Sequence, residues 1–420
     1  MAGDCPPYND FAGWVHDPHN QRVYMFGGLR PGDESETPAS DFYCYNTTTM
    51  KWENLTNALT FREPYKSPYS KTELKREKRH LPALSHPGCT LWRYEGHSFI
   101  FLFGGYDAAS DGASSKVVII NLKLREWWYE DRLGRTNPRI APSIVAIGNK
   151  VYIFGGYKEL EGDPQACYSY SIAEHRPEDP ISPWAWEVRD TPYSGHLPSD
   201  FVVGQAVAVY GGKKILLAPG RLNHTDERRL HFSKKTLFYF RIDLKAFHEI
   251  LDPAGDPLPQ DIGWYSIFEL KQLPLTASAI STQADITKKR GRPPKNPTPP
   301  SQVPSPQLRA SVSSSSSDSV VICAWQPRPG TKSEDKLFEP EIYHFSLTPD
   351  DRLDCLKIIQ KVCDLNHNFE GFMVVGERMH LLGSYSDENS SQTDSDSDSD
   401  DESDATWNIH LDIPFNCRRE

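Results

Sequence analysis

A glycine pair at the end of a short apolar run recurs along the chain, and no other feature limits the fold as strongly. The runs begin at Arg22, Phe99 and Lys150 and end in the pairs Gly27–Gly28, Gly104–Gly105 and Gly155–Gly156. A polar loop, a second apolar run and at least one tryptophan follow each pair. Short β-branched and aromatic runs bounded by glycine and proline predict strands, and their recurrence predicts a repeat architecture.

Three weaker copies follow in the second half of the chain. They begin at Lys214, Val320 and Arg378, and their second apolar runs are Leu237–Leu244, Glu341–Leu347 and Thr406–Ile413. We assign Trp264 as the tryptophan of the fourth copy. Gly105 and Gly156 are 51 residues apart, which matches a repeat period of about 50 residues. Longer steps between the other copies indicate insertions.

The glycine pair, the aromatic residue after it at Tyr106 and Tyr157, and the spaced tryptophan make the chain resemble the kelch-repeat proteins. The resemblance covers about residues 10–415 and is strongest in the first three copies. It implies an all-β fold, a six-bladed kelch-type β-propeller with disordered inserted loops. In that fold each copy is a four-stranded blade whose second strand ends at the glycine pair. Six hairpins of a β-sandwich are the alternative, although a sandwich does not require a recurring Gly-Gly and Trp.

The last copy leaves little chain for its fourth strand. Its first three strands are predicted at 369–375, 378–382 and 407–413, so only residues 414–420 follow. Either this tail or residues 2–8 would supply the missing strand. Joining the two ends of the chain removes exposed sheet edges.

Composition and charge limit the functional classes. The chain has 420 residues with 46 basic and 57 acidic side chains and a net charge of −11, so it has no general attraction to anionic surfaces. The start, residues 1–10, has no signal-peptide pattern, and the apolar runs are too short to span a membrane. The eight cysteines form no Cys-x-x-Cys. We therefore expect a monomer of the nucleus or cytoplasm, without membrane contact.

Three insertions interrupt the repeat, at 61–86, 281–319 and 386–405. The first alternates lysines and arginines with glutamates and predicts a solvated helix or loop. The second is rich in proline and serine and the third is rich in serine and aspartate, so both are predicted to be disordered. The third insertion holds nine acidic residues. Pairing of this acidic block with the basic part of the second insertion is one hypothesis.

The second insertion contains a short basic segment that looks like an AT-hook. Its residues are Lys288, Lys289, Arg290, Gly291, Arg292, Pro293 and Lys295. A narrow A·T-rich minor groove attracts inserted arginines, a glycine lets the backbone lie deep in the groove, and the lysines would contact phosphates. The alternatives are a nuclear import signal and a plain linker. We predict contact with A·T-rich DNA.

The resemblance also implies a protein-binding face, formed by the loops after the glycine pairs. The candidate residues on these loops are Arg30, Tyr106, Tyr157, Lys158, Arg221, Arg328 and Tyr385. Arginine binds carboxylates with two parallel hydrogen bonds, and Arg and Tyr are common at binding hot spots. We therefore expect an acidic or carboxylate-ended protein partner.

No catalytic motif occurs in the sequence. It contains no Gly-x-Ser-x-Gly, P-loop, Rossmann or His-Glu-x-x-His pattern, so we predict a non-enzymatic scaffold without a cofactor. Two alternatives remain open: a substrate-recognition adaptor of a ubiquitin ligase that does not contact DNA, and a galactose-oxidase-like or other metal-dependent propeller enzyme.

Overall fold

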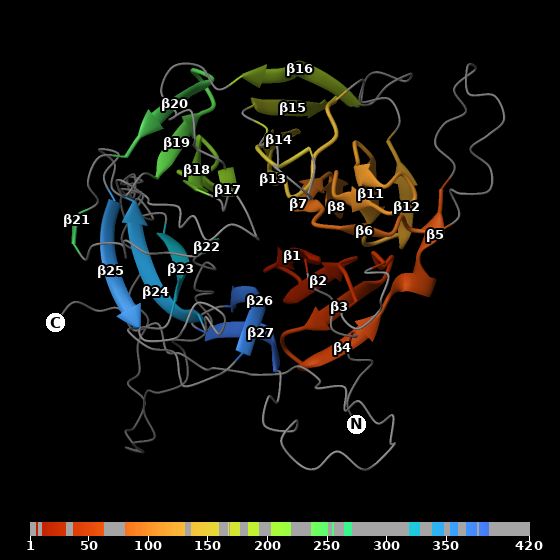
Figure 1. Cartoon of the computed structure of the whole chain (residues 1–420), viewed down its shortest axis with the longest axis horizontal. Helices are drawn as coiled ribbons and strands as arrows, with labels where there is room; N and C mark the ends of the chain where they lie inside the picture. The colour runs from red at the N-terminus through yellow and green to blue at the C-terminus, as the bar shows by residue number, and fades with distance from the viewer. Residues whose placement is uncertain are drawn as a thin grey trace, which may run out of the picture.

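The chain forms successive antiparallel sheets that are arranged around a common axis in the computed structural model (Figure 1). The structure describes residues 6, 11–30, 37–62, 80–130, 136–158, 167, 169–176, 184–192, 203–219, 237–250, 254–255, 264–270, 319–327, 338–347, 353–359, 367–375 and 378–385. Within these residues the elements are strands, apart from one short 3-10 helix, η1 (Thr56–Ala58). This is the all-β architecture that the repeat predicts.

The first four sheets each contain one copy of the repeat in the order first, second, third and fourth strand. The first sheet is β1 (Gly13–Asp17), β2 (Arg22–Phe26), β3 (Phe42–Asn46) and β4 (Lys51–Asn54); the second is β7 (Gly88–Tyr94), β8 (His97–Phe103), β11 (Val117–Asn121) and β12 (Glu126–Tyr129); the third is β13 (Ser143–Ile147), β14 (Lys150–Phe154), β15 (Ser169–His175) and β16 (Trp184–Pro192); the fourth is β17 (Val203–Val209), β18 (Lys214–Pro219), β19 (Phe238–Arg241) and β20 (Ala246–Glu249).

Two further sheets follow. The fifth is β22 (Trp264–Leu270), β23 (Ser319–Pro327), β24 (Phe338–Leu347) and β25 (Leu353–Ile359), and the sixth has, among the described residues, β26 (His367–Val375) and β27 (Arg378–Tyr385). The three runs predicted to begin the weaker copies are thus all second strands. Residues 414–420 and, apart from Pro6, residues 2–8 lie outside the described residues, so six complete blades stay a prediction.

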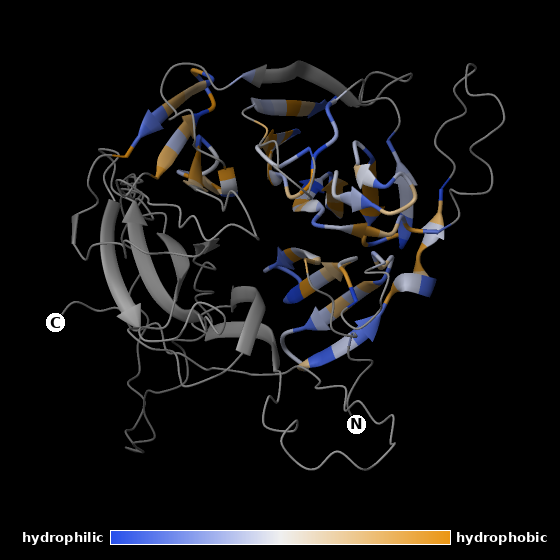
Figure 2. Cartoon of the chain, viewed as in Figure 1, coloured by the Kyte–Doolittle hydropathy of each residue, from blue (hydrophilic) through white to orange (hydrophobic). Residues whose placement is uncertain are grey.

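The first strand of each sheet lies beside the first strand of the next. These contacts run from β1 to β7, β13, β17, β22 and β26 in chain order, which places the first strands innermost in Figure 1. The fourth strands face outward, and β4 carries mostly hydrophilic residues in Figure 2. This radial order is that of a β-propeller.

Short strands from the linkers cover parts of two sheets. β5 (Thr60–Phe61) pairs in parallel with β12 at the edge of the second sheet, and β21 (Ala254–Gly255) pairs in the same way with β25. A separate small sheet joins β6 (Leu84–Ser85), β9 (Tyr106–Asp107) and β10 (Gly112–Ala113). β5 comes after the first sheet and β21 after the fourth, and each pairs with the outer strand of the next sheet. Each therefore covers an exposed sheet edge and joins two neighbouring sheets.

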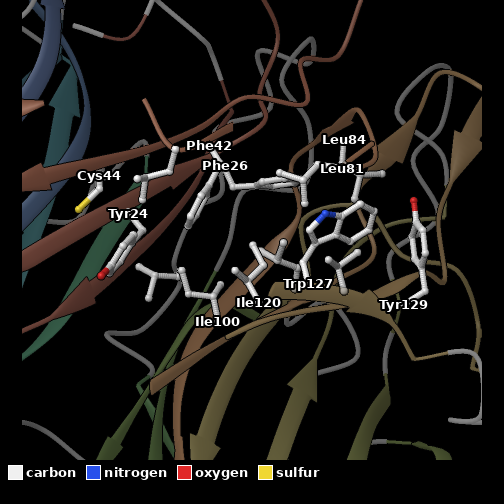
Figure 3. Close-up of a cluster of buried hydrophobic side chains, with 14 residues drawn as sticks. Tyr24, Phe26, Phe42, Cys44, Leu81, Leu84, Ile100, Ile120, Trp127 and Tyr129 are labelled. Carbon is white, nitrogen blue, oxygen red and sulfur yellow. The ribbon is translucent and has the colours of Figure 1, made fainter. Parts of the chain in front are cut away.

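The core lies between neighbouring sheets. Alternate side chains of a strand point to opposite faces, so each sheet packs against both of its neighbours. Between the first two sheets, aromatic and aliphatic residues form one cluster in which Trp127 is only 1% exposed (Figure 3). The cluster includes Tyr24, Phe26, Phe42 and Cys44 from the first sheet and Ile100, Leu102, Ile120 and Trp127 from the second.

The tryptophan assignment of the fourth copy is wrong. Trp264 begins β22, the first strand of the fifth sheet. In the fourth sheet Phe247 pairs with Phe240, just as Trp127 pairs with Ile120 in the second sheet. Phe247 is buried in the cluster between the third and fourth sheets. An aromatic ring is needed at this position to fill space between the sheets, and phenylalanine meets that need.

The glycine pairs are required by close contacts with the linkers. A Cβ at Gly27 would lie 2.2 Å from the carbonyl oxygen of Leu84, and one at Gly104 would lie 2.3 Å from that of Arg139. Both glycines have positive φ, +67° and +72°. The second glycine of each pair then donates its N–H to the same carbonyl, at 3.0 Å for Gly28 and 2.8 Å for Gly105. Side chains are therefore excluded where one sheet meets the linker to the next.

Arg139 adds a side-chain contact at one of these junctions. It lies in the linker between the second and third sheets and is fully buried. Its guanidinium donates to the carbonyl oxygens of Gly155 (2.9 Å) and Ser169 (3.0 Å) and to the hydroxyls of Ser169 (3.0 Å) and Ser171 (3.3 Å). The linker is thus fixed to the glycine pair and third strand of the following sheet.

The first insertion is partly built into the ring. Leu81, Leu84 and Ser85 are buried, and β5 and β6 lie at its two ends, so these parts of 61–86 are not solvated. Its charged centre, 63–79, lies outside the described residues, as do 281–318 and 386–405.

Substitution of two glycines separates strain from steric exclusion. Gly148→Ala forces φ +59° on alanine but meets no atom within 4 Å, so we expect a cost of about 1–2 kcal/mol in free energy of unfolding. Gly104→Ala adds the clash with the Arg139 carbonyl, and we expect it to cost at least about 2 kcal/mol more. Urea unfolding of both variants measures the difference. Equal costs would contradict the junction described above.

Candidate protein-interaction site

The glycine pairs bring the predicted binding loops to the same end of the sheets. We call this the glycine end; it contains the residues that follow Gly28, Gly105 and Gly156. The residue directly after each pair is joined to a neighbouring segment: Leu29 to Pro38, Tyr106 to Ser85 and Tyr157 to Ile140. The beginnings of the loops are therefore fixed by backbone pairing in three consecutive sheets.

Arg30 already has a carboxylate partner at this end. Its Nη2 lies 2.5 Å from Oδ2 of Asp41, and the Arg30 side chain remains 49% exposed. Asp41 comes just before β3, across the loop from Arg30, so only the pairing of β2 with β3 brings the two together. No local sequence pattern predicts this pair, and an acidic partner would have to compete with Asp41.

Tyr106 belongs to a polar turn at the second sheet. Its hydroxyl donates to Oδ1 of Asp111 at 2.7 Å. Asp107 is 3% exposed, and its carboxylate accepts from Lys116 and from the backbone N–H of Ala109. The ring of Tyr106 is half-buried. These contacts hold the turn in one conformation and fix the position of the Tyr106 side chain at the glycine end.

Tyr157 and Lys158 form the corresponding part of the third sheet. The backbone of Tyr157 exchanges two hydrogen bonds with Ile140, both 2.7 Å. The Tyr157 side chain is half-buried, and Lys158 is exposed. Arg30, Tyr106, Tyr157 and Lys158 are thus presented at one end of the ring, on three neighbouring sheets.

The other predicted contact residues are not described to the same degree. Tyr385 is the last residue of β27. Arg221 and Arg328 lie outside the described residues, close to the ends of β18 and β23. The basic segment with Arg290 and Arg292 also lies outside them.

The cysteines of the described region lie in the core or beside it. Cys44 and Cys167 are buried, Cys89 is half-buried, and all three are free thiols. Burial raises the pKa of Cys44 to about 11 and raises the pKa of Cys89 as well. In the described ranges, no group of three or more His, Cys, Asp and Glu side chains could hold a metal ion. No helix there has the length and apolar character that a membrane span requires.

The sheets, the radial order and the glycine pairs together define a β-propeller. The chain is 26% identical over 216 residues to Kelch domain-containing protein 3 of Homo sapiens, and 26% identical over 216 residues to that of Bos taurus. Each alignment covers 48% of this chain and 48% of the relative, so the chain spans about half the length of the curated relatives it matches. No family model matches the chain. The similarity and the fold agree, and both support kelch-type repeats in this chain.

The raised thiol pKa predicts low reactivity of the buried cysteines. At pH 8 a thiol with a pKa of about 11 is almost entirely protonated, and only the thiolate reacts. We expect Cys44 to resist a maleimide in the native protein and to react after unfolding in urea, as peptide mass spectrometry would show. Rapid native labelling of Cys44 would contradict the packing of the first two sheets.

Proposed function

We propose that the chain is a non-enzymatic scaffold of the nucleus that binds a protein partner at the glycine end of its propeller and A·T-rich DNA through Arg290-Gly291-Arg292-Pro293. The observation that carries the protein-binding part is the common placement of Arg30, Tyr106, Tyr157 and Lys158 at one end of three consecutive sheets. A ring fixed at its junctions presents such loops with little loss of entropy on binding. The kelch similarity supports recognition of proteins.

The partner is an acidic or carboxylate-ended segment. The Arg30 side chain is half-exposed although it is paired with Asp41, so an incoming carboxylate can approach it from solvent. Lys158 is exposed on the third sheet and would attract the same kind of ligand. Exposed ion pairs contribute little to stability, so exchange of Asp41 for a ligand carboxylate costs little.

Removal of the competing carboxylate tests this proposal. Asp41→Asn takes the negative charge from Arg30, and we expect affinity for the partner to rise about threefold, which corresponds to about 0.6 kcal/mol. Asp243→Asn is the matched control, because Asp243 forms a similar pair with Arg241 at 2.8 Å, away from the glycine end. Quantitative affinity purification from nuclear extract, followed by titration of the purified partner, measures both. Equal effects of the two variants would contradict a site at Arg30.

The DNA-binding part rests on the composition of the basic segment. Arginines on either side of a glycine suit the narrow minor groove of A·T tracts. We expect Arg290→Ala with Arg292→Ala to lower affinity for an A·T-rich duplex at least about tenfold while changing binding to a G·C-rich duplex little. Fluorescence anisotropy at fixed salt measures both. Unchanged A·T binding with loss of nuclear accumulation would favour an import signal, and the scaffold would then act as an adaptor without DNA contact.

A further inference from the structure

The end of the ring opposite the glycine end carries its own pattern of charge. We call it the hairpin end; it contains the turns between first and second strands and those between third and fourth strands. Seven basic residues at or beside these turns are exposed: Lys51, Arg93, Lys123, Arg125, Arg176, Lys213 and Lys245. They come from all four sheets whose side chains the structure describes. Within the described ranges the exposed acidic residues of this end are fewer: Glu53, Glu95 and Asp243.

Arginines of the same end already neutralise the carboxylates. Arg125 contacts Glu53 at 3.2 Å, Arg176 contacts Glu174 at 2.8 Å, and Arg241 contacts Asp243 at 2.8 Å. Asp17, which is fully buried, is bound by Arg93 at 2.5 Å across the first two sheets. Among the described residues, Lys51, Lys123 and Lys213 therefore leave a positive excess at this end, although the whole chain has a net charge of −11.

Some of the basic residues recur at equivalent positions of the repeat. In the turns between the third and fourth strands of the second and fourth sheets, Arg125 and Lys245 occupy equivalent positions. Their φ angles are +54° and +49°, and they come directly before β12 and β20. A basic residue also begins the second strand in several copies, at Arg22, Lys150 and Lys214. A repeated position carries its side chain to the same end of every sheet, so the charges gather on one side of the ring.

The glycine end lacks such an excess. Its exposed basic residues in the described ranges are Arg30, Lys116 and Lys158, and Arg30 and Lys116 are bound to Asp41 and Asp107. Asp111 and Glu249 are exposed there as well. Among the described residues only the hairpin end thus carries a clear positive excess.

The strands that flank the basic segment point to the same end. β22 and β23 pair with Leu270 opposite Ser319, as Asp17 lies opposite Arg22 in the first sheet. The stretch between Leu270 and Ser319 is therefore joined to the ring at the hairpin end. Lys288 follows Leu270 by 18 residues, a length of chain that spans at most about 60 Å.

We propose that the hairpin end of the propeller is a second contact for duplex DNA, at which exposed lysines bind the phosphates beside the A·T site. The inference rests on the proposed function, because the basic segment would bring the duplex to this end. Contacts with phosphates position a protein on DNA and carry no sequence information. The hairpin end then supplies affinity and salt dependence, and the basic segment supplies the preference for A·T.

A pair of charge-reversed variants tests the inference in the full chain. Lys123→Glu with Lys213→Glu changes two exposed lysines of the second and fourth sheets, whereas Arg30→Glu with Lys158→Glu makes the same change of net charge at the glycine end. Binding to a fluorescent A·T-rich duplex is measured between 50 and 200 mM salt. We expect the hairpin-end variant to reduce the magnitude of the slope of log K against log salt by about 2, since each lost phosphate contact removes about 0.9 from it. We also expect its affinity to fall at least about tenfold.

The glycine-end variant should keep the slope of the native chain. The inference is overturned if both variants lose affinity to the same extent, because net charge alone would then explain the loss. It is also overturned if the hairpin-end variant binds the duplex as tightly as the native chain does. Thermal unfolding of both variants shows whether the ring is intact. The alanine variant at Arg290 and Arg292 separates the two proposals: if it binds normally while the hairpin-end variant does not, the proposed role of the basic segment fails and the phosphate contact stands.

Discussion

The close approach of a linker carbonyl to the first glycine of the first two pairs is the constraint on which the beginning of the ring depends. Any side chain at Gly27 or Gly104 would occupy the position of the carbonyl of Leu84 or Arg139. The second glycine then donates its N–H to that same oxygen. The first and second sheets are thereby each fixed to the linker that leads into the next sheet. The order of the sheets around the axis follows from this repeated junction.

The same junction separates the molecule into two chemically different ends. The loops after the glycine pairs form an end where cations are matched by Asp41 and Asp107, and the strand turns form an end with excess lysine. β22 and β23 join the basic segment to the turn end. The acidic block follows Tyr385, which pairs with His367 at the opposite end of the sixth sheet. Pairing between the two tracts would therefore have to reach from one end of the ring to the other.

Much of the fold could be predicted from the sequence, because Gly-Gly and the alternating apolar runs report backbone geometry directly. The second strands at Lys214, Val320 and Arg378 were recognisable even without the glycines. Trp264 was misassigned, since the position between the sheets requires a large ring and accepts Phe247. The pairing of Arg30 with Asp41 and the burial of Arg139 depend on strand register, which sequence spacing across a loop does not specify. The sequence therefore predicts the positions of Arg30, Tyr106 and Tyr157 after the glycine pairs, but not the residues that they contact.

Amide hydrogen exchange at the glycine pairs tests the central claim most directly. The N–H groups of Gly28 and Gly105 donate to linker carbonyls, whereas Gly96 lies in an exposed turn between β7 and β8. If the linkers close the ring as described, Gly28 and Gly105 exchange as slowly as the amides within β2 and β8, while Gly96 exchanges rapidly. Exchange of Gly28 and Gly105 at the rate of Gly96 would contradict the account.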